Sequence, residues 1–567
     1  LCEILEQHPE VDAYSFDGLH YAGVCYCQHC RAAYRADTGE EIPDPDLNNP
    51  AFRRYQHWAD RKMEDVVRKV QKRLKAIKPD VALVTWTTNA GRFGHFLSIP
   101  RNMPARMNLL LDAPDQEFWL DETNRGATII PAFANAYIWA TTNHRVAFSE
   151  PYLMSHGNPY GKDSFPPHEI ERRMMLALTY GAAPSIAVAQ PPQMQEALYA
   201  IMDQVQRRKE WLTHKKPEPW AAIVMSDNTR NFYGRAAGLV EERYLASVLG
   251  TFRACVEEHL PVAVINDWNL TAEELAKYAV VILPNTACLD DRQIAGLREY
   301  VENGGGLVAT LDTSLFDEFG SPRENFGLAE VFGVDYAGPP TAETTETPEL
   351  DVNFAKALGP DYFEKRKSIF DFRLPSESPL LAGKLKTYIA DQPVTFKGPA
   401  IRVRPKGEEV RSETLLRPRT SGAAEFPAIV RRDFGKGRVI YLGCGLDAAY
   451  YLYSYPYQRI VLANAIRAAA AKAPPIEIEA PMCVHTTVMR QSKKGERLVV
   501  HLYNNINTTA HHAYPVDDVP LREETVPIHD IRVRFRGTQR IKSFYLEPDH
   551  TPLEPQRDGD DTVDLVK

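Results

Sequence analysis

The sequence lacks any run of about 18 or more apolar residues, the length that a membrane-spanning helix requires. It also lacks a long run of lysine and arginine, and its 75 acidic residues outnumber its 66 basic ones, so the formal net charge is −9. A protein that binds nucleic acid or an anionic membrane needs a basic face. We therefore expect neither of these partners, and we expect a neutral or weakly charged substrate.

Cysteine is sparse, with eight residues in 567, and its spacing is not that of a small disulfide scaffold. Internal repeats and low-complexity tracts are also absent. The chain starts at Leu1, and its first residues already read as helix interior. We therefore expect that the true N-terminus is missing or processed. A soluble protein is expected, and its compartment stays unknown.

Residues 1–215 alternate between predicted strands and helices. The clearest helix covers residues 51–78, because apolar side chains, among them Val66 and Leu74, recur every three or four residues until Pro79. Short apolar runs predict five strands, at residues 11–16, 81–86, 107–111, 145–149 and 185–189. Such alternation is typical of parallel strands joined by crossover helices, either in an open sheet or in a barrel.

Two changes in pattern predict domain boundaries. A linker at Lys215–Pro219 precedes a second region of alternating strands and helices, in which Gly304 to Gly306 read as a helix end and a turn. After Pro474-Pro475, β-branched alternation indicates an antiparallel β domain. The second region is predicted to hold strands at 221–225, 262–265, 279–283 and 307–311, and helices at 241–259, 291–302 and 456–472.

Three acidic residues follow predicted strands, namely Asp17, Glu117 and Glu150. Active sites of parallel α/β folds lie at the carboxyl ends of strands, and glycoside cleavage needs two carboxyl groups. Aromatic side chains, on which sugars stack, lie close by in the sequence. We accordingly predict a substrate site made by His20, Trp86, Trp119 and Tyr152. Such acids also serve as helix caps or arginine partners, which is the structural alternative.

The cluster Cys25-Tyr-Cys27-Gln-His-Cys30 has a spacing that presents three thiolates to one Zn²⁺. We predict a structural zinc there, with no cofactor for catalysis; a metal-free thiol cluster is the alternative. Cys288 also follows a predicted strand, but it lacks a tight glycine elbow and a histidine or glutamate partner in the sequence. We interpret Cys288 as structural, which argues against an amidotransferase-like or peptidase-like enzyme.

These residues together resemble a known family. Phe16-Asp17-Gly18, followed by the cysteine cluster and Thr38-Gly39, resembles part of the barrel of glycoside hydrolase family 42 β-galactosidases. The segments 281–285 and 300–305 are similar to the flavodoxin-like trimerisation domain of that family, and 489–491 with 501–504 to its terminal β domain. The resemblance implies an α/β protein with a partial TIM barrel over 1–215, a flavodoxin-like domain over 216–473 and a C-terminal antiparallel β sandwich over 474–567.

The sequence also departs from that family. Its fourth barrel strand ends in Asn-Glu, whereas this chain has Phe16-Asp17, which resembles the nucleophile strand of α-L-fucosidases. Glu150 matches the position of the family nucleophile on strand seven, and Glu117 follows strand six. The resemblance therefore implies that Asp17 acts with either Glu117 or Glu150 in a retaining mechanism, and it does not identify the sugar.

Two functions are consistent with these residues. The first is a glycoside hydrolase that acts on a carbohydrate, as a homo-oligomer (dimer or trimer) built through the flavodoxin-like domain. The second is a non-catalytic carbohydrate-binding or assembly protein, derived from a truncated or degenerate glycosidase. The altered fourth-strand motif and the absence of the first three barrel strands from the sequence motivate the second.

Overall fold

The computed structural model describes residues 1–16, 24–86, 105–118, 129–151, 153, 164–185, 192–235, 240–339, 367–389, 393–418, 424–492, 495–506, 522–537, 541–557 and 562–566. The chain divides into two compact units. The first comprises residues 1–45, 55–218 and 474–567, and the second comprises residues 46–54 and 219–473. Within the described residues, no helix combines the length and the apolar character needed to cross a membrane.

In the first unit, short parallel strands follow one another in chain order. They form the sheets β1-β2-β3 and β4-β5-β6, and only Gln116 separates β3 from β4. Every pair in these two sheets is parallel. The strands are β1 Ala13–Phe16, β2 Ala82–Trp86, β3 Ala113–Asp115, β4 Glu117–Phe118, β5 Phe148–Pro151 and β6 Ala183–Pro184. The predicted parallel alternation is confirmed for the described residues.

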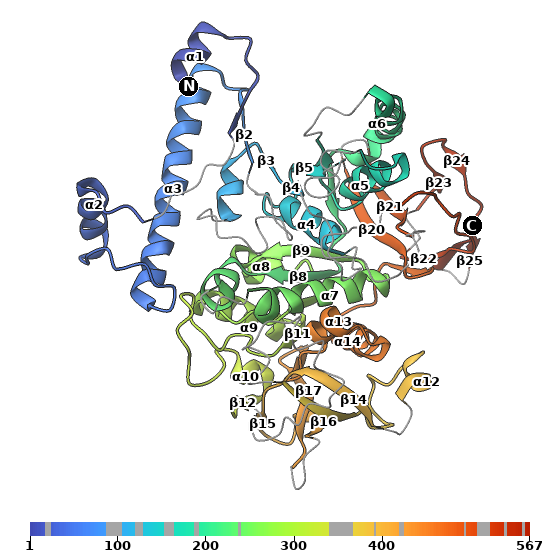
Figure 1. The fold of residues 1–567 in the computed structure, drawn as a ribbon. Helices are drawn as coiled ribbons and strands as arrows, with labels where there is room; N and C mark the ends of the chain where they lie inside the picture. The colour runs from blue at the N-terminus through green and yellow to red at the C-terminus, as the bar shows by residue number, and fades with distance from the viewer. Residues whose placement is uncertain are drawn as a thin grey trace. The chain divides into compact units, whose positions relative to one another are not determined.

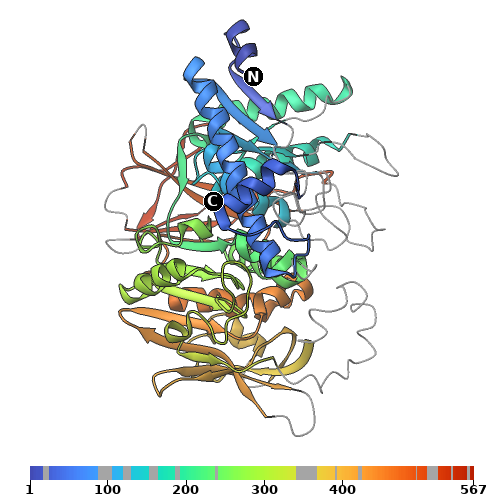
Figure 2. The same ribbon diagram turned by 90° about the vertical axis from the view of Figure 1, so that its left-hand side faces the viewer.

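Helices connect these strands, as parallel neighbours require. The long helix α3, drawn in blue in Figures 1 and 2, follows β1 and precedes β2 along the chain. The helices are α1 Cys2–Gln7, α2 Gln28–Thr38, α3 Pro50–Ile77, α4 Ile129–Ala140, α5 Pro167–Thr179 and α6 Pro192–Leu212. Helix α4 was not predicted, because it is buried on almost every side and so has no polar stripe to mark its period.

Two local predictions in this unit are wrong. Residues 107–111 were predicted to be a strand, but Ala105–Leu110 form the 3-10 helix η1, and the strand comes after it. A short apolar run cannot by itself distinguish a buried strand from a buried helix. In α3, Val66 is 45% exposed although it was placed on the buried face, whereas Val67 is 1% exposed. The buried stripe passes through Val67, four residues after Met63 and seven before Leu74.

The C-terminal residues belong to the same compact unit as the parallel strands. Strand β20 (Val484–Gln491) pairs antiparallel with β21 (Arg497–Asn504) and with β7 (Lys215–Pro217). The segment predicted as a linker therefore contains a strand whose partner is about 270 residues further along the chain, which no local pattern reveals. A second antiparallel sheet has the order β19-β22-β26-β25, with β19 Ile476–Glu479, β22 Arg532–Arg536, β25 Gln556–Arg557 and β26 Thr562–Val566.

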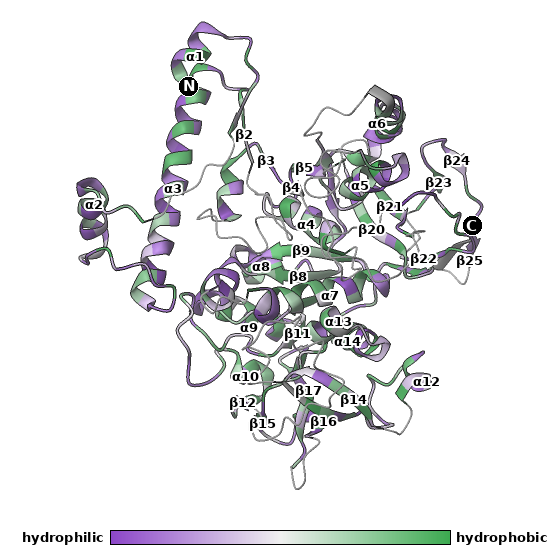
Figure 3. Cartoon of the chain, in the orientation of Figure 1, coloured by the Kyte–Doolittle hydropathy of each residue, from purple (hydrophilic) through white to green (hydrophobic). Residues whose placement is uncertain are grey.

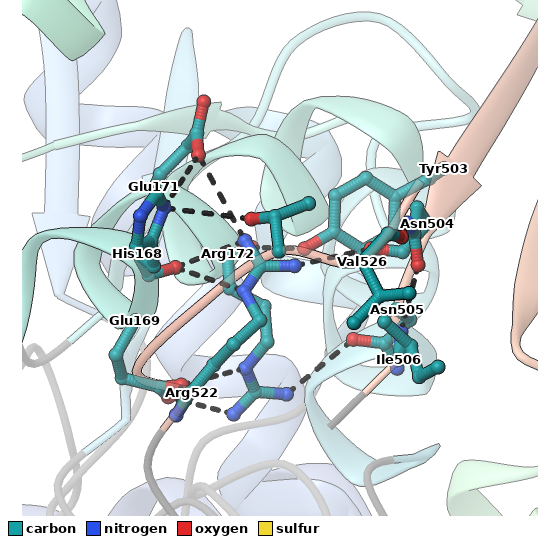
Figure 4. A network of polar contacts seen from close by, with 11 residues as sticks. His168, Glu169, Glu171, Arg172, Tyr503, Asn504, Asn505, Ile506, Arg522 and Val526 are labelled. Atoms are coloured by element: carbon teal, nitrogen blue, oxygen red, sulfur yellow. Dashed lines mark hydrogen bonds and ion pairs between the residues drawn. The ribbon is translucent and has the colours of Figure 1, made fainter. Parts of the chain in front are cut away.

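A buried ionic network joins helix α5 to these C-terminal strands (Figure 4). The Glu169 carboxylate accepts hydrogen bonds from Arg172 (2.7 and 2.9 Å), from Arg173 (2.7 Å) and from the backbone N–H of Arg522 (2.9 Å). The Arg522 guanidinium in turn donates to the carbonyls of His168 and Asn504. The first turn of α5 is thus tied to a segment more than 330 residues away in the sequence.

The second unit is built on a nine-stranded sheet with the order β14-β13-β16-β17-β18-β11-β10-β8-β9. Its parallel part consists of β8 Ala221–Met225, β9 Val262–Asn266, β10 Val280–Leu283, β11 Gly306–Thr310 and β18 Gly437–Leu442. Counted in chain order, these strands run 2-1-3-4-5, which is the flavodoxin-like order. Antiparallel strands extend the sheet beyond β18, namely β13 Lys367–Arg373, β14 Val394–Pro399, β16 Arg411–Pro418 and β17 Phe426–Phe434.

The central strands of the second unit are fully buried. In Figure 3, β8 and β9 are drawn mostly in the hydrophobic colour, as expected for parallel strands covered on both faces. Gly304 adopts φ +111° between helix α9 and β11, which confirms the predicted helix end and turn. The main helices are α7 Ala246–Glu257, α9 Asp291–Glu302, α13 Leu446–Tyr453 and α14 Pro456–Ala469.

Shorter elements complete the described fold. They are the π-helical segments η2 Thr229–Gly234 and η4 Glu241–Leu245, the 3-10 helix η5 Asp267–Asn269, the helices α8 Ala272–Leu275, α10 Ala329–Phe332 and α12 Leu385–Ile389, and the strand pairs β12 Val334–Tyr336 with β15 Val403–Pro405 and β23 Tyr545–Leu546 with β24 Thr551–Pro552. The chain is therefore a mixed α/β protein with one large sheet.

Candidate active site

The structure places some of the predicted site residues and leaves others out. Asp17, His20, Trp119 and Tyr152 lie outside the described residues. Trp86 is described by its backbone alone, as the last residue of β2, and Glu117 in the same way, as the first residue of β4. Glu150 is described in full and lies within β5 rather than directly after it, since that strand runs to Pro151.

Backbone register brings Glu117 and Glu150 to paired positions on neighbouring parallel strands. The Glu150 N–H donates to the carbonyl of Gln116 over 2.7 Å, which holds the two strand ends together. Glu150 is only 3% exposed. Burying a carboxylate is costly unless its surroundings offer polar partners, so a glutamate at this depth needs a polar environment.

Polar side chains next to Glu150 in the fold include residues that were not predicted as site residues. On one face of β5, the Ser149 hydroxyl and the amide of Asn135 in α4 lie within reach of the Gln116 side-chain amide, at 3.4 and 3.3 Å. Because side chains alternate along a strand, Glu150 faces away from this group and from α4. Its side chain therefore points to the face of β5 opposite Ser149 and α4.

Asp115 is the second buried carboxylate described near Glu150. It ends β3, is 2% exposed, and accepts hydrogen bonds from the Gln116 N–H (2.8 Å) and from the Ser185 hydroxyl (3.2 Å). The sequence signal that could have identified it is its place in the run Asp115-Gln116-Glu117, where residues two apart share a face of an extended chain. Reasoning from the sequence selected Glu117 alone from this run.

The three clustered cysteines come together as predicted. One sulfur atom from each of Cys25, Cys27 and Cys30 lies within 4.8 Å of the other two. Sulfur atoms bound to one tetrahedral Zn²⁺, each about 2.3 Å from it, lie about 3.8 Å apart, so this group could bind a metal with a small adjustment. Within the described residues, no other group of three or more potential ligands is this close together.

Hydrogen bonds already favour a thiolate in this cluster. The Cys30 N–H donates to the Cys27 sulfur at the N-terminus of α2, and together with the neighbouring thiols it lowers the pKa of Cys27 to about 7. Burial, together with the neighbouring thiols Cys25 and Cys27, raises the pKa of Cys30 to about 11. Cys27 therefore loses its proton more readily than Cys30, and a metal ion would have to displace the protons that remain on the cluster.

Aromatic residues of α2 and α3 pack together next to the cysteine loop. Tyr34 and Tyr55 are almost fully buried, and both contact the Trp58 ring, with centroids 5.1 and 5.7 Å away. The Trp58 indole N–H donates to Asp37 over 2.8 Å, which links α3 back to α2. The segment with Cys25, Cys27 and Cys30 is thus next to a packed and hydrogen-bonded helix pair, which suits a structural metal site.

Cys288 is fully buried in the second unit. Burial raises the pKa of its thiol far above the usual range, and its backbone N–H is bonded to the Thr229 hydroxyl over 3.0 Å. A thiol that stays protonated is a poor nucleophile. The geometry therefore agrees with the structural interpretation of Cys288.

Comparison with known proteins gives three findings. A family model described as ThuA, trehalose utilisation, matches residues 231–469, which lie in the second unit. The β-galactosidases BgaB of Geobacillus sp. (strain Y412MC61) and bgaB of Geobacillus kaustophilus are 23% identical to this chain over 238 residues. Those matches cover 41% of this chain and 27% of the length of each enzyme.

Solved structures are similar over the whole chain. The α-L-fucosidase isoenzyme 2 of Paenibacillus thiaminolyticus has a TM-score of 0.66 and 15% identity, covering 100% of this chain and 77% of its own. The β-galactosidase of Bacillus circulans sp. alkalophilus has a TM-score of 0.66 and 13% identity, covering 100% and 80%. The resemblance to family 42 β-galactosidases and to α-L-fucosidases is therefore confirmed as a likeness of fold.

Proposed function

We propose that this chain is an O-glycosyl hydrolase that cleaves a carbohydrate substrate with a pair of carboxyl groups. The observation that carries the proposal is the position of Glu150, a buried carboxylate in a parallel strand, on the face of β5 opposite Ser149 and α4 and in register with Glu117. Strand ends of this kind hold the catalytic acids of parallel α/β enzymes. Solved structures that are similar to this chain carry the names of glycosidases, which supports the same class.

The pair we propose is Asp17 with Glu150, with Glu117 as the alternative partner of Asp17. Register partners on neighbouring strands have backbones only about 4.8 Å apart. We therefore propose that Glu117 and Glu150, which are register partners, act on the same side of a bound sugar. Strand β1, which Asp17 follows in the sequence, is separated from β5 by β2 and by the β3–β4 strand. Carboxyl groups on those two strands can approach a glycosidic bond from different sides.

The mechanism we propose is retaining. One carboxylic acid protonates the leaving oxygen, and the other carboxylate attacks the anomeric carbon to form a glycosyl ester, which water then hydrolyses. The aromatic rings of Trp86, Trp119 and Tyr152, together with His20, are proposed to bind the sugar. The names of the similar enzymes cover two different sugars, so the substrate is left at the level of a glycoside.

The cysteine cluster is proposed to hold a structural Zn²⁺ through Cys25, Cys27 and Cys30. Three thiolates and a further ligand would saturate a tetrahedral ion, so the metal supplies rigidity to the loop before α2 and takes no part in catalysis. We also propose that residues 1–215 form the later part of a (β/α)8 barrel, that residues 216–473 are an oligomerisation domain, and that residues 474–567 are a β sandwich.

The test is hydrolysis of a panel of aryl glycosides that includes β-D-galactosides and α-L-fucosides. Turnover by the wild-type chain is expected to fall at least about 10³-fold in both Asp17→Asn and Glu150→Gln, because each removes one of the two carboxyl groups. Glu171→Gln, an exchange on the partly exposed side of α5, is the matched control and should keep full activity.

Azide separates the two roles. Azide is added to Asp17→Ala and to Glu150→Ala. If azide restores the activity of one variant and the product is a glycosyl azide of inverted configuration, that variant has lost the nucleophile. Full activity in Glu150→Gln would exclude Glu150 from the reaction. If the wild-type chain binds oligosaccharides but hydrolyses none of the panel, the non-catalytic carbohydrate-binding function replaces the proposal.

A further inference from the structure

Four hydrogen bonds form a closed ring around the peptide bond between Ser149 and Glu150. The Asp115 carboxylate accepts from the Gln116 N–H (2.8 Å), and the Gln116 carbonyl accepts from the Glu150 N–H (2.7 Å). On the other side of β5, the Ser149 carbonyl accepts from the Ser185 N–H (2.7 Å), and the Ser185 hydroxyl donates back to Asp115 (3.2 Å).

The ring links three strands through one carboxylate. Gln116 follows β3, Ser185 follows β6, and β5 lies between them in the parallel arrangement. Asp115 therefore reaches across β5. Its carboxylate is hydrogen-bonded to Gln116 and Ser185, the two residues whose backbones hold β5 on either side. Among the described residues, no other side chain is bonded both to Gln116 and to Ser185.

We propose that Asp115 is a positioning residue that fixes the backbone of Glu150 in the catalytic geometry. This inference rests on the proposed function, because it assigns Asp115 a role in the reaction that Glu150 performs. Asp115 is 2% exposed and is therefore shielded from competing water, so its hydrogen bonds to the Gln116 N–H and the Ser185 hydroxyl are not exchanged for solvent contacts. The carboxylate acts through the Gln116 N–H and the Ser185 hydroxyl, because the backbones of these two residues hold β5 on either side.

The side chain of Gln116 cannot take over this role. Its side-chain NH2 group donates instead to the side-chain oxygen Oδ1 of Asn135 (3.3 Å) and to the Ser149 hydroxyl (3.4 Å). The Gln116 side chain thus links β5 to α4, whereas the Asp115 carboxylate links the two segments on either side of β5. Gln116 and Asp115 are neighbours in the sequence, and each side chain therefore holds a different part of the Ser149–Glu150 segment in place.

Three variants separate geometry from charge. Asp115→Asn keeps an oxygen that accepts from the Gln116 N–H, and its amide group can donate to the Ser185 hydroxyl, which rotates to accept. Asp115→Ala removes both bonds, and Ser185→Ala removes only the second while leaving the Ser185 N–H in place. Asp112→Ala is the matched control, because Asp112 lies three residues earlier and bonds instead to Lys75 and the Leu83 N–H.

A displacement of about 1 Å at a catalytic group can cost about 10²-fold in rate. We therefore expect Asp115→Ala to lower kcat by about 10- to 100-fold with little change in KM, Ser185→Ala to lower it less, and Asp115→Asn to stay within about threefold of wild type with an unchanged pH profile. Asp112→Ala should keep the wild-type kcat. Hydrogen–deuterium exchange should be faster in the peptide that contains residues 149–151 in Asp115→Ala, and unchanged in Asp115→Asn.

The outcomes distinguish this inference from the proposed function. Wild-type kcat in Asp115→Ala, in a chain where Glu150→Gln is inactive, would overturn the positioning role and leave the glycosidase assignment standing. Equal loss in Asp115→Asn and Asp115→Ala would also overturn it, because geometry would then not be what Asp115 supplies. If the wild-type chain hydrolyses no glycoside, the proposed function fails, and unchanged exchange at residues 149–151 in Asp115→Ala would refute the positioning of this strand end separately.

Discussion

Replacing Glu169 by glutamine should destabilise the first unit more than any exchange on the surface of α5. Its side chain has no exposed area, and it accepts hydrogen bonds from the side chains of Arg172 and Arg173 and from the Arg522 N–H. An amide cannot balance two buried guanidinium groups. Breaking a buried ion pair by removing one partner costs about 3–5 kcal/mol, which is the loss we expect in the free energy of unfolding at pH 7.

The same network predicts a dependence on pH. Burial alone would raise the pKa of Glu169, but Arg172 and Arg173 outweigh it and lower the pKa from 4.5 to about 2. A carboxylate with a lowered pKa stabilises the folded state fully above pH 4.5, and this contribution is lost as the pH falls from 4.5 toward 2. At about 1.4 kcal/mol for each pKa unit, the contribution is about 3 kcal/mol.

The assay is urea unfolding followed by circular dichroism between pH 7 and pH 3. Wild type should lose stability below pH 4.5 more steeply than Glu169→Gln, because the variant no longer takes up this proton. Glu171→Gln is the matched control on the same helix, since Glu171 is 37% exposed and lies 3.8 Å from His168 and 4.0 Å from Arg522. A loss below about 1 kcal/mol in Glu169→Gln, or an equal loss in both variants, would refute the reasoning.

Two further predictions concern the cysteine cluster and a buried lysine. Wild-type protein is expected to bind about one Zn²⁺ per chain, measured by elemental analysis, and Cys27→Ser should abolish this binding. Cys483 lies outside the cluster, so Cys483→Ser should leave zinc binding unchanged. Wild-type protein that takes up no zinc would exclude the site. Lys215 is buried, and its burial lowers the pKa of its ammonium group from 10.5 to about 7. Its charge therefore destabilises the fold fully below pH 7, and this cost disappears as the pH rises from 7 to 10.5. Lys215→Met should accordingly unfold at higher urea concentration than wild type at pH 7, with a difference that shrinks toward pH 10; a difference independent of pH would contradict this.

Several elements could be predicted from the sequence because their signals are local. Strand β8 and helix α9 have the bounds that were predicted, residues 221–225 and 291–302. Helix α9 is marked by Asp290 and Gln293, which form a capping box, and by the turn at Gly304. Continuous apolar runs bounded by turns likewise indicate the buried parallel strands of the second unit.

Other elements could not be predicted because their signals are not local. Helix α4 carries buried side chains on nearly all sides, so neither its period nor its ends are visible in the sequence. The run at residues 107–111 is apolar enough for a strand, yet it forms the 3-10 helix η1, in which Met107 and Asn108 are buried. Strand β7 exists only because β20 pairs with it. Partners distant in sequence decide each of these cases.

The sequence by itself was enough to propose chemical roles for residues of the candidate site, and it shows which of these residues are close together along the chain. It identified the strand-end acids, the three cysteines that gather within 4.8 Å, and the unreactive position of Cys288. Only the tertiary structure decided that Glu117 and Glu150 are register partners, that Asp115 bridges the two sides of β5, and that Glu169 is enclosed by arginines from two distant segments. The physical reason is that hydrogen bonds and ion pairs act over a few ångströms in space, and the residues that make them are brought to that distance only when strands pair and helices pack.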